Sequence, residues 1–446
     1  MNLIQTLEAG QWAEFEVTTP LFCPYHNRWG EPAYRFSGSF EHRPLGIHGS
    51  STSGSPLIED ALGRLVGVAD VASAEPQRLS FAFDGRRLRV ENEMPGSTSL
   101  FVASEPAEGG RHWRDYNAAL ARVIFSNDAS LAPPFWEAPE YCTWVEQKWE
   151  AAQLGGGVTP HEVLNDDFVD RYLEAVDRLG LPPGKLTIDH GWQDGDETYG
   201  DWDAHPQRFA DLQKTAERIK AAGFVPGIWL APIWLHPASR AASAYPESVG
   251  GPIVPSNADS PNRGGWNYWL PTEALASQMQ QVLGRLYGQG FRKFKFDMIY
   301  GPMHEMIELH RVIYEAAKSV APDAEIETHH PNPYFARYTD VVRTNDVLCH
   351  DRQAWRELTR EHFEVCDRSA FGKVINLDHI GGNDPAVRPE DFLEHLSFYQ
   401  QATGYPVVSL LPSHIGGQAV EAVRQLMVER EARPRARSRF ISQPEP

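Results

Sequence analysis

The chain has 446 residues, with 41 Lys and Arg against 60 Asp and Glu, so its formal net charge is −19. Apolar residues make up 41% of the chain and charged residues 23%, which is typical of a folded globular protein and not of a disordered one. The acidic balance argues against nucleic acid and anionic membranes as partners, because both attract a positively charged surface. The sequence has no run of about 18 apolar residues, the length that a transmembrane helix needs.

The cysteines and the first residues favour a cytoplasmic protein. The four cysteines are far apart and form no CxxC pair: Cys23, Cys142, Cys349 and Cys366. This spacing argues against a zinc ribbon or a redox motif, and scattered thiols are typical of a reducing compartment. The first residues lack a basic stretch followed by an apolar core, so no secretory signal is expected.

The aromatic content is consistent with a sugar-like ligand. The chain contains 13 Trp and 21 Phe beside its acidic excess. Aromatic platforms together with carboxylates favour an enzyme that binds a neutral polyhydroxy compound. Most tryptophans pack in a protein core, however, so the composition alone leaves this open.

Residues 1–134 are predicted to form a β-sandwich. Residues 78–83 (RLSFAF) and 87–91 (RLRVE) alternate apolar and polar side chains, and Gly, Pro, Asp and Ser separate such runs. Short alternating strands over this length are typical of a sandwich domain.

Residues 135–420 are predicted to form a (β/α)8 TIM barrel. Eight β-branched or aromatic runs indicate strands at 142–147, 185–190, 226–232, 293–298, 325–330, 340–346, 373–380 and 405–412. Between them, amphipathic periodicity predicts helices, most clearly at 168–179, 212–222 and 275–287. Alternation of eight strands with helices favours a closed parallel barrel.

A doubly wound sheet is the alternative fold. It is disfavoured because no GxGxxG or GxxxxGK[ST] loop follows the first strand. Gly180 and Gly223 follow two of the predicted helices, as left-handed caps do. Residues 421–446 are predicted to form a short helix and a disordered tail rich in Arg and Pro.

Charged and aromatic residues stand at the ends of nearly all the predicted strands. They are Glu146, Asp189, Trp192, Trp229, Lys295, Asp297, Glu327, Arg343, Asp346, Asp378 and His379. Charged groups within apolar runs are costly unless they are paired or functional. Since the carboxyl ends of barrel strands surround the active site, their convergence predicts a catalytic centre there.

Asp297 is the best candidate for a nucleophile. In the run KFKFD, Lys295 and Asp297 alternate with Phe294 and Phe296, which directs the charged pair into the barrel. A lysine two residues away lowers the pKa of the carboxylate and keeps it ionised, as a nucleophile requires. The alternative is a buried structural ion pair.

Asp346 is the candidate for a proton donor two strands later. A glycosidase needs a second carboxyl group with a raised pKa, and Asp346 ends the run DVVRTND. Arg343 lies three residues away, so the alternative is an ion-paired loop carboxylate.

Metal and serine chemistry are disfavoured. His329 and His330 are adjacent on a predicted strand and point to opposite faces, and no HxH or HExxH spacing occurs. No GxSxG elbow is present either. We therefore expect no metal site and no organic cofactor.

Four motifs together resemble retaining α-galactosidase-type glycoside hydrolases of families 27 and 36 and, more distantly, family 31. Those barrels carry a DDGW-like motif, a GLWxxP-like motif, a K-x-D motif and an R-T-x-D motif on successive or nearby strands. This sequence has IDHGW at 188–192, GIWLAP at 227–232, KFD at 295–297 and RTND at 343–346. The resemblance covers residues 140–415, and the motifs stand in the same order.

The resemblance implies a retaining exo-acting α-glycosidase. Asp297 would be the nucleophile and Asp346 the acid/base, with a covalent glycosyl-aspartate intermediate and carboxyl groups about 5–5.5 Å apart. Residues expected to bind a small carbohydrate substrate are Asp189, His190, Trp192, Trp229, Lys295, Arg343, Asp378 and Trp144.

The preferred sugar stays open, because Asp189-His190 stands where the galactosidases have paired aspartates. Within the same chemistry, the alternatives are a family 31-like α-glucosidase and a transglycosidase. A metal-dependent barrel hydrolase and a sugar-binding pseudo-enzyme are alternatives of other classes. The presence of both carboxylates argues against the pseudo-enzyme. Acidic, tryptophan-rich barrels often associate, so a homo-oligomer is also an expectation.

Overall fold

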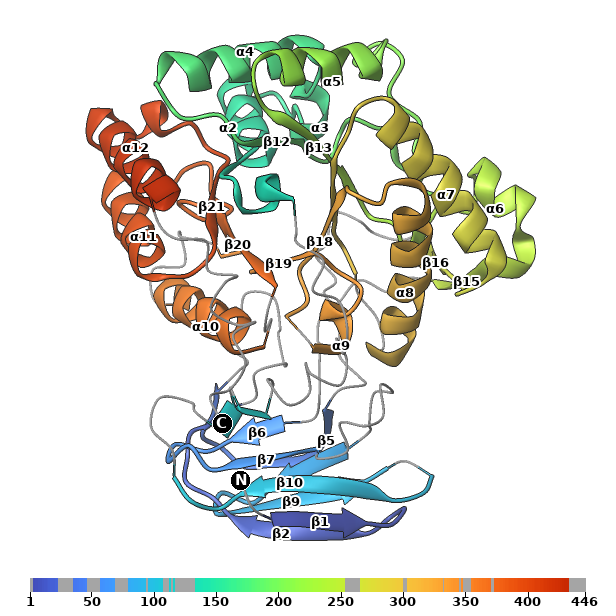
Figure 1. The fold of residues 1–446 in the computed structure, drawn as a ribbon, viewed down its shortest axis with the longest axis vertical. Coiled ribbons are helices and arrows are strands. Elements are labelled where there is room, and N and C mark those ends of the chain that lie inside the picture. The colour runs from blue at the N-terminus through green and yellow to red at the C-terminus, as the bar shows by residue number, and fades with distance from the viewer. Residues whose placement is uncertain are drawn as a thin grey trace.

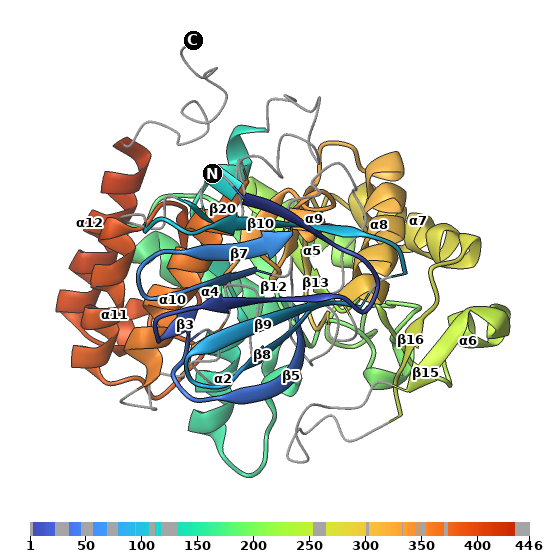
Figure 2. The same cartoon turned by 90° about the horizontal axis from the view of Figure 1, so that it is seen from below.

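The structure is a computed structural model. It describes residues 3–22, 35–45, 57–68, 79–93, 95–106, 112–113, 115–116, 133–252, 265–299, 303–331, 333–344, 346–347, 354–369 and 373–432. A ring of helices surrounds a barrel of strands, and the N-terminal strands form a separate layer below it (Figure 1). Seen from below, these N-terminal strands cross in front of the barrel (Figure 2). No helix among the described residues is long and apolar enough to cross a membrane.

The N-terminal layer consists of two antiparallel sheets, which confirms the predicted sandwich. Its strands are β1 (Leu3–Leu7), β2 (Trp12–Glu16), β3 (Leu21–Phe22), β4 (Arg35–Phe36), β5 (Phe40–Leu45), β6 (Leu57–Glu59), β7 (Leu65–Val68), β8 (Leu79–Phe83), β9 (Arg87–Asn92) and β10 (Thr98–Ala103). Among the described residues one sheet has the order β1-β10-β7-β6-β3-β4 and the other β2-β9-β8-β5. In β9, Leu88 and Val90 are buried whereas Arg87 and Arg89 are exposed, as alternation predicts.

A closed barrel of parallel strands follows, as predicted. Its strands within the described residues are β11 (Glu140–Cys142), β12 (Lys185–Ile188), β13 (Val225–Leu230), β17 (Lys293–Phe296), β18 (Glu325–Thr328), β19 (Val341–Arg343), β20 (Val374–His379) and β21 (Tyr405–Val408). They pair in chain order, and β21 closes the ring against β11. A small antiparallel sheet is inserted after β13 and consists of β14 (Trp234–Leu235), β15 (Val249–Pro252) and β16 (Asn267–Trp269).

One predicted strand is largely wrong. The run at 142–147 was expected to be extended, but β11 ends at Cys142 and helix α2 (Trp144–Leu154) begins two residues later. Its aromatic and β-branched residues resemble a strand, whereas Glu146 is buried in the helix and accepts a hydrogen bond from the Leu411 backbone N–H at 2.9 Å. Glu146 therefore does not lie at a strand end.

The other helices are α3 (Pro160–Val163), α4 (Asp166–Arg178), α5 (Leu212–Ala221), α6 (Arg240–Ala244), α7 (Glu273–Gly288), α8 (Met303–Val320), α9 (Pro333–Ala336), α10 (Ala354–Ser369), α11 (Pro389–Gln401) and α12 (Gly417–Ala432). Short 3-10 turns lie at Pro134–Glu137, Asp196–Thr198, Pro246–Ser248 and Pro412–His414. The Asn165 side chain caps α4 by accepting from the Phe168 N–H at 2.8 Å, and Gly180 beyond its end has φ 62°. The predicted tail after residue 432 lies outside the described residues.

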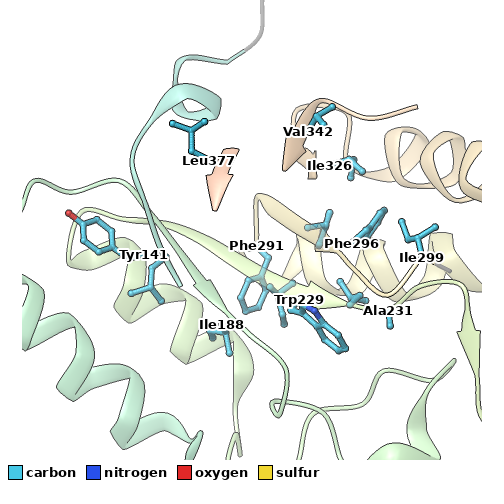
Figure 3. Close-up of a cluster of buried hydrophobic side chains, with 14 of the residues drawn as sticks. Tyr141, Ile188, Trp229, Ala231, Phe291, Phe296, Ile299, Ile326, Val342 and Leu377 are labelled. Carbon is cyan, nitrogen blue, oxygen red and sulfur yellow. The ribbon is translucent and has the colours of Figure 1, made fainter. Parts of the chain in front are cut away.

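Most barrel strands have an apolar outer face and charged or polar side chains on the inner face, whereas β13 (VPGIWL) and β21 (YPVV) carry no charged residue. Figure 3 shows part of the buried hydrophobic cluster around the barrel, with Ile188, Phe296, Ile326, Val342 and Leu377 among its labelled strand residues. Their sequence neighbours point into the barrel, since successive residues of a strand alternate between its faces. The barrel interior therefore receives an unusual number of charged groups for a packed barrel core.

Buried ion pairs fill the lower part of this interior. Lys293 contacts Glu140 and lies 2.6 Å from Glu327, and Lys185 lies 3.0 Å from Glu325, with all of these side chains 0–1% exposed. Burial lowers the pKa of Lys185 to about 8 and raises that of Glu325 to about 7. These buried ion pairs fill the barrel interior below the groups at the carboxyl ends of the strands.

Candidate active site

Asp297 directly follows β17 and is held by three donors. The backbone N–H of Met298 donates to Oδ1 at 2.8 Å, the Trp229 indole N–H donates to Oδ2 at 3.1 Å, and Arg343 Nη2 donates to Oδ1 at 3.0 Å. Met298 has φ 55°, an uncommon conformation for a non-glycine residue that directs its N–H back at the carboxylate. The Asp297 side chain is still 23% exposed, so its carboxylate is accessible.

The surroundings keep Asp297 ionised. Burial alone would raise its pKa, but the nearby Arg343, His329 and Lys295 outweigh burial and hold the pKa well below its usual range. The sequence pointed to Lys295 as the neighbour responsible. In the structure Arg343 has the larger effect, because it contacts the carboxylate directly.

Asp346 lies just beyond β19, two strands further round the barrel. Arg343 Nη1 donates to its Oδ1 at 3.3 Å and Asn383 Nδ2 donates to its Oδ2 at 3.0 Å. The side chain is 24% exposed. Burial and the neighbouring Asp378 carboxylate raise the pKa of Asp346 to about 6, against the lowering effect of Arg343. The two candidate catalytic groups therefore have opposite pKa shifts.

A single guanidinium joins these carboxylates. Arg343 ends β19, is 3% exposed, and contacts Asp297 through Nη2 and both Asp346 and Asp378 through Nη1, the last at 3.0 Å. The planar fork of an arginine fixes the relative positions of such acceptors. Asp297 and Asp346 thus lie on the same end of the barrel, separated by one guanidinium and its hydrogen bonds.

Asp189 and Lys295 form a buried ion pair beside Asp297. Lys295 Nζ lies 2.8 Å from Asp189 Oδ2, and the Cys142 thiol donates to the same oxygen at 3.1 Å. The His190 backbone N–H donates to the other oxygen at 2.8 Å. Burial alone would raise the pKa of Asp189, but the adjacent Lys295 ammonium group outweighs burial and lowers this pKa below its usual value. Both members of the pair are therefore charged. Both carboxylate oxygens of this predicted sugar-binding residue already have protein partners.

Aromatic rings extend outward from Asp297. His190 stacks on Trp229 with ring centres 4.2 Å apart, and the ring centre of the half-buried Trp144 lies 6.1 Å from that of His190. The Tyr199 hydroxyl is 2.8 Å from His190 Nε2. Burial and the neighbouring His161 lower the pKa of His190 to about 3, so the ring is neutral. This side of the site is aromatic and uncharged.

Trp192 contacts one of these aromatic residues, Trp229, from the protein interior. It is fully buried, and its indole N–H donates to the backbone oxygen of Trp229 at 2.8 Å. This hydrogen bond therefore fixes the backbone of Trp229. Gly191 precedes it with φ 117°, and a Cβ there would lie 2.9 Å from the His161 backbone, which explains the glycine in IDHGW.

Sequence reasoning missed Asn383 and Lys148. Asn383 follows a pair of glycines after β20 and contacts Asp346, whereas Lys148 on α2 contacts Asn383. The GGN run after a barrel strand was a signal for Asn383, since it predicts an ordered turn at the catalytic end. No local pattern around Lys148 distinguishes it from a surface helix residue.

One group of side chains has the spacing of a metal site among the described residues. The ligand atoms of Asp346, Asp378 and His379 lie within 4.8 Å of one another. Arg343 Nη1 already donates to both of these carboxylates. A metal ion would have to displace or repel this guanidinium, so the donor set fits a metal poorly.

Comparison with solved structures identifies proteins of the same fold. No family model matches the chain, and no curated protein matches it. An alpha-galactosidase from Thermus thermophilus in complex with p-nitrophenyl alpha-D-galactopyranoside aligns with a TM-score of 0.59 and 15% identity over 96% of this chain and 86% of that chain. A GH36 alpha-galactosidase from Geobacillus stearothermophilus aligns with a TM-score of 0.59 and 12% identity over 96% of this chain and 62% of that chain.

A GH31 dextranase from Flavobacterium johnsoniae complexed with glucose aligns with a TM-score of 0.64 and 12% identity over 94% of this chain and 54% of that chain. The class that the fold defines is therefore a (β/α)8 barrel with N-terminal antiparallel sheets, as found in these GH36 and GH31 enzymes. The fold that the sequence motifs implied is confirmed.

Proposed function

We propose that this protein is a retaining, exo-acting α-glycosidase, similar to the α-galactosidases, that acts on a small carbohydrate. The observation that carries the proposal is the pair of accessible carboxyl groups with opposite pKa shifts, Asp297 and Asp346, at the carboxyl ends of strands two apart in the barrel. Retaining glycosidases need one ionised carboxylate and one carboxylic acid in such a pair.

The residues suit a double displacement. In the first step a carboxylate oxygen of Asp297 bonds to the anomeric carbon while the bond to the leaving-group oxygen breaks. The proton of Asp346 passes to that oxygen. In the second step Asp346 takes a proton from water, whose oxygen bonds to the anomeric carbon and releases Asp297.

The other groups bind and orient the sugar. Arg343 holds both carboxylates, and Trp229 fixes Asp297 through its indole N–H. We propose that the glycone contacts Lys295, Asp378, His190 and the half-buried Trp144. Among the similar structures, one holds an alpha-galactoside and another glucose. Because a neutral His190 follows Asp189, glucose and xylose remain alternatives to galactose.

A panel of aryl α- and β-glycosides tests this function. The panel contains galactose, glucose, N-acetylgalactosamine, xylose and deoxysugars. We expect turnover of one or more α-glycosides with retained configuration in the first-formed product, observed by proton NMR. We expect Asp297→Ala to abolish it with an unchanged circular dichroism spectrum. Inversion of configuration, or normal turnover by the variant, would contradict the proposal.

We also propose a cytoplasmic location. The described cysteines, Cys142 and Cys366, are buried free thiols. Free thiols are typical of proteins in reducing compartments. Cell fractionation of the producing organism tests this, and recovery from a secreted fraction would contradict it.

A further inference from the structure

The second oxygen of Asp346 is held by a residue outside the barrel strands. Asn383 lies in the loop after β20 and is 9% exposed, and its Nδ2 donates to Asp346 Oδ2 at 3.0 Å. Its backbone N–H also donates to the Val347 carbonyl at 2.8 Å, one residue beyond Asp346. The loop is thus fastened to the segment that carries the proposed acid/base.

The orientation of the Asn383 amide is set by Lys148 on α2. Lys148 Nζ donates to Asn383 Oδ1 at 3.0 Å and to the Asn383 backbone oxygen at 2.6 Å. An ammonium group is only a donor, so it must face the oxygen of the amide. The amide nitrogen therefore faces Asp346, and a flipped amide would place two donors against each other.

We propose that Lys148 and Asn383 are positioning residues that hold Asp346 in its catalytic orientation through the hydrogen bond that Asn383 Nδ2 donates to Oδ2. This inference rests on the proposed function, in which Asp346 must donate a proton in one step and accept one in the next. A hydrogen bond donated to a carboxylate favours its ionised form. Asn383 thus opposes Asp378, whose charge favours the protonated form.

Other charged or titratable groups also face Asp346. Arg343 comes from β19, and Asp378 and His379 come from β20, with His379 Nε2 4.0 Å from Asp346 Oδ1. Asp384 lies beside Asn383 in the same loop and, like Asp346, interacts with the charge of Lys148. Asn383 donates to Oδ2 of Asp346, so the loss of this hydrogen bond changes both the orientation of the carboxyl group and its proton affinity.

Two variants and a matched control test the proposal. Lys148→Met and Asn383→Ala each remove one link, and Lys220→Met changes an exposed lysine on α5 that is not part of this network. With an accepted aryl α-glycoside, we expect the basic limb of the kcat/KM profile to move upward by about half to one pH unit in both variants. We expect kcat to fall roughly tenfold, within the range of general acid–base effects, with little change in KM. Lys220→Met should match the wild type.

The double variant tests whether the lysine acts through the amide. If Lys148 acts only through Asn383, the effects of the two substitutions on kcat do not add. We therefore expect the double variant Lys148→Met/Asn383→Ala to lose no more activity than the more impaired single variant. An unchanged basic limb in either single variant, or fully additive losses, would overturn the proposal.

A measurement without turnover separates this inference from the proposed function. Carbodiimide labels protonated carboxyl groups, and mass spectrometry reports labelling of Asp346 as a function of pH. We expect a midpoint near the pKa of about 6 in the wild type and a higher midpoint in both variants. If the midpoints shift but no glycoside is turned over, the proposed function fails, whereas the effect of Lys148 and Asn383 on the ionisation of Asp346 stands. Equal midpoints would overturn the positioning role alone.

Discussion

Arg343 donates from Nη2 to Oδ1 of Asp297 over 3.0 Å, and this contact does more than any other neighbour to keep the carboxylate ionised. Since the same guanidinium also contacts Asp346, changing it affects both steps of the proposed reaction. Arg343→Lys keeps the charge but loses the planar fork. We expect kcat/KM to fall at least about tenfold and a decrease in kcat/KM at low pH to appear, because the pKa of Asp297 rises. Wild-type kinetics in this variant would contradict the role given to Arg343.

The pH dependence of the wild type follows from the two carboxyl groups. Activity requires Asp297 ionised and Asp346 protonated. The pKa of Asp297 lies well below its usual range and that of Asp346 is about 6. We therefore expect kcat/KM to be flat below about pH 6 and to fall about tenfold per pH unit above it. A rise in kcat/KM with pH through 6 would contradict the assignment of Asp346 as the acid.

Much of this site could be predicted from local sequence, and the reason is the alternation of strand residues. Lys295 and Asp297 share the inner face with a period of two, and Phe296 shares the outer face with the apolar core. By contrast, Lys148 and Asn383 are 235 residues apart in sequence, and their contact depends on how α2 packs against the loop after β20. No local period encodes such a contact.

The same limit explains the largest error. The run at 142–147 has the residue types of a strand, but the buried Glu146 finds its partners, Leu411 and His414, at the other end of the barrel sequence. These partners favour a helix that begins just after Cys142. The propensity of the run was overridden by tertiary contacts.

Asp346→Ala separates an acid/base from a structural carboxylate. Without the proton donor, substrates with poor leaving groups should lose roughly 100-fold or more in kcat/KM, while activated aryl glycosides lose far less. Azide should partly restore activity on the activated substrates, since it attacks the glycosyl-enzyme without base assistance. An equal loss on both substrate types would indicate that Asp346 is structural.

The buried pair Lys185 and Glu325 should behave as one unit in stability. Both side chains are 0% exposed and their charged atoms are 3.0 Å apart. Removing one partner leaves a buried charge, so Lys185→Met or Glu325→Gln should each cost about 3 kcal/mol in free energy of unfolding. The double variant should be closer to the wild type than the worse single variant. Urea unfolding measures this, and additive losses in the double variant would contradict it.

Chelation tests the metal-dependent alternative. Arg343 contacts both carboxylates of the group formed by Asp346, Asp378 and His379, and so opposes a cation there. We expect incubation with EDTA, followed by dialysis, to leave kcat/KM unchanged. Loss of activity that is restored by a divalent ion would favour a metal-dependent hydrolase.

The central claim is that Asp297 forms a covalent bond with the sugar. A fluorinated glycosyl fluoride of the accepted α-glycoside series forms such an intermediate quickly and releases it slowly, so intact mass spectrometry can detect it. We predict the mass of one glycosyl group per chain, and peptide mapping should locate it on Asp297, with no adduct on Asp297→Ala. An adduct on another residue, or turnover of the reagent without any adduct and with inversion, would contradict the account.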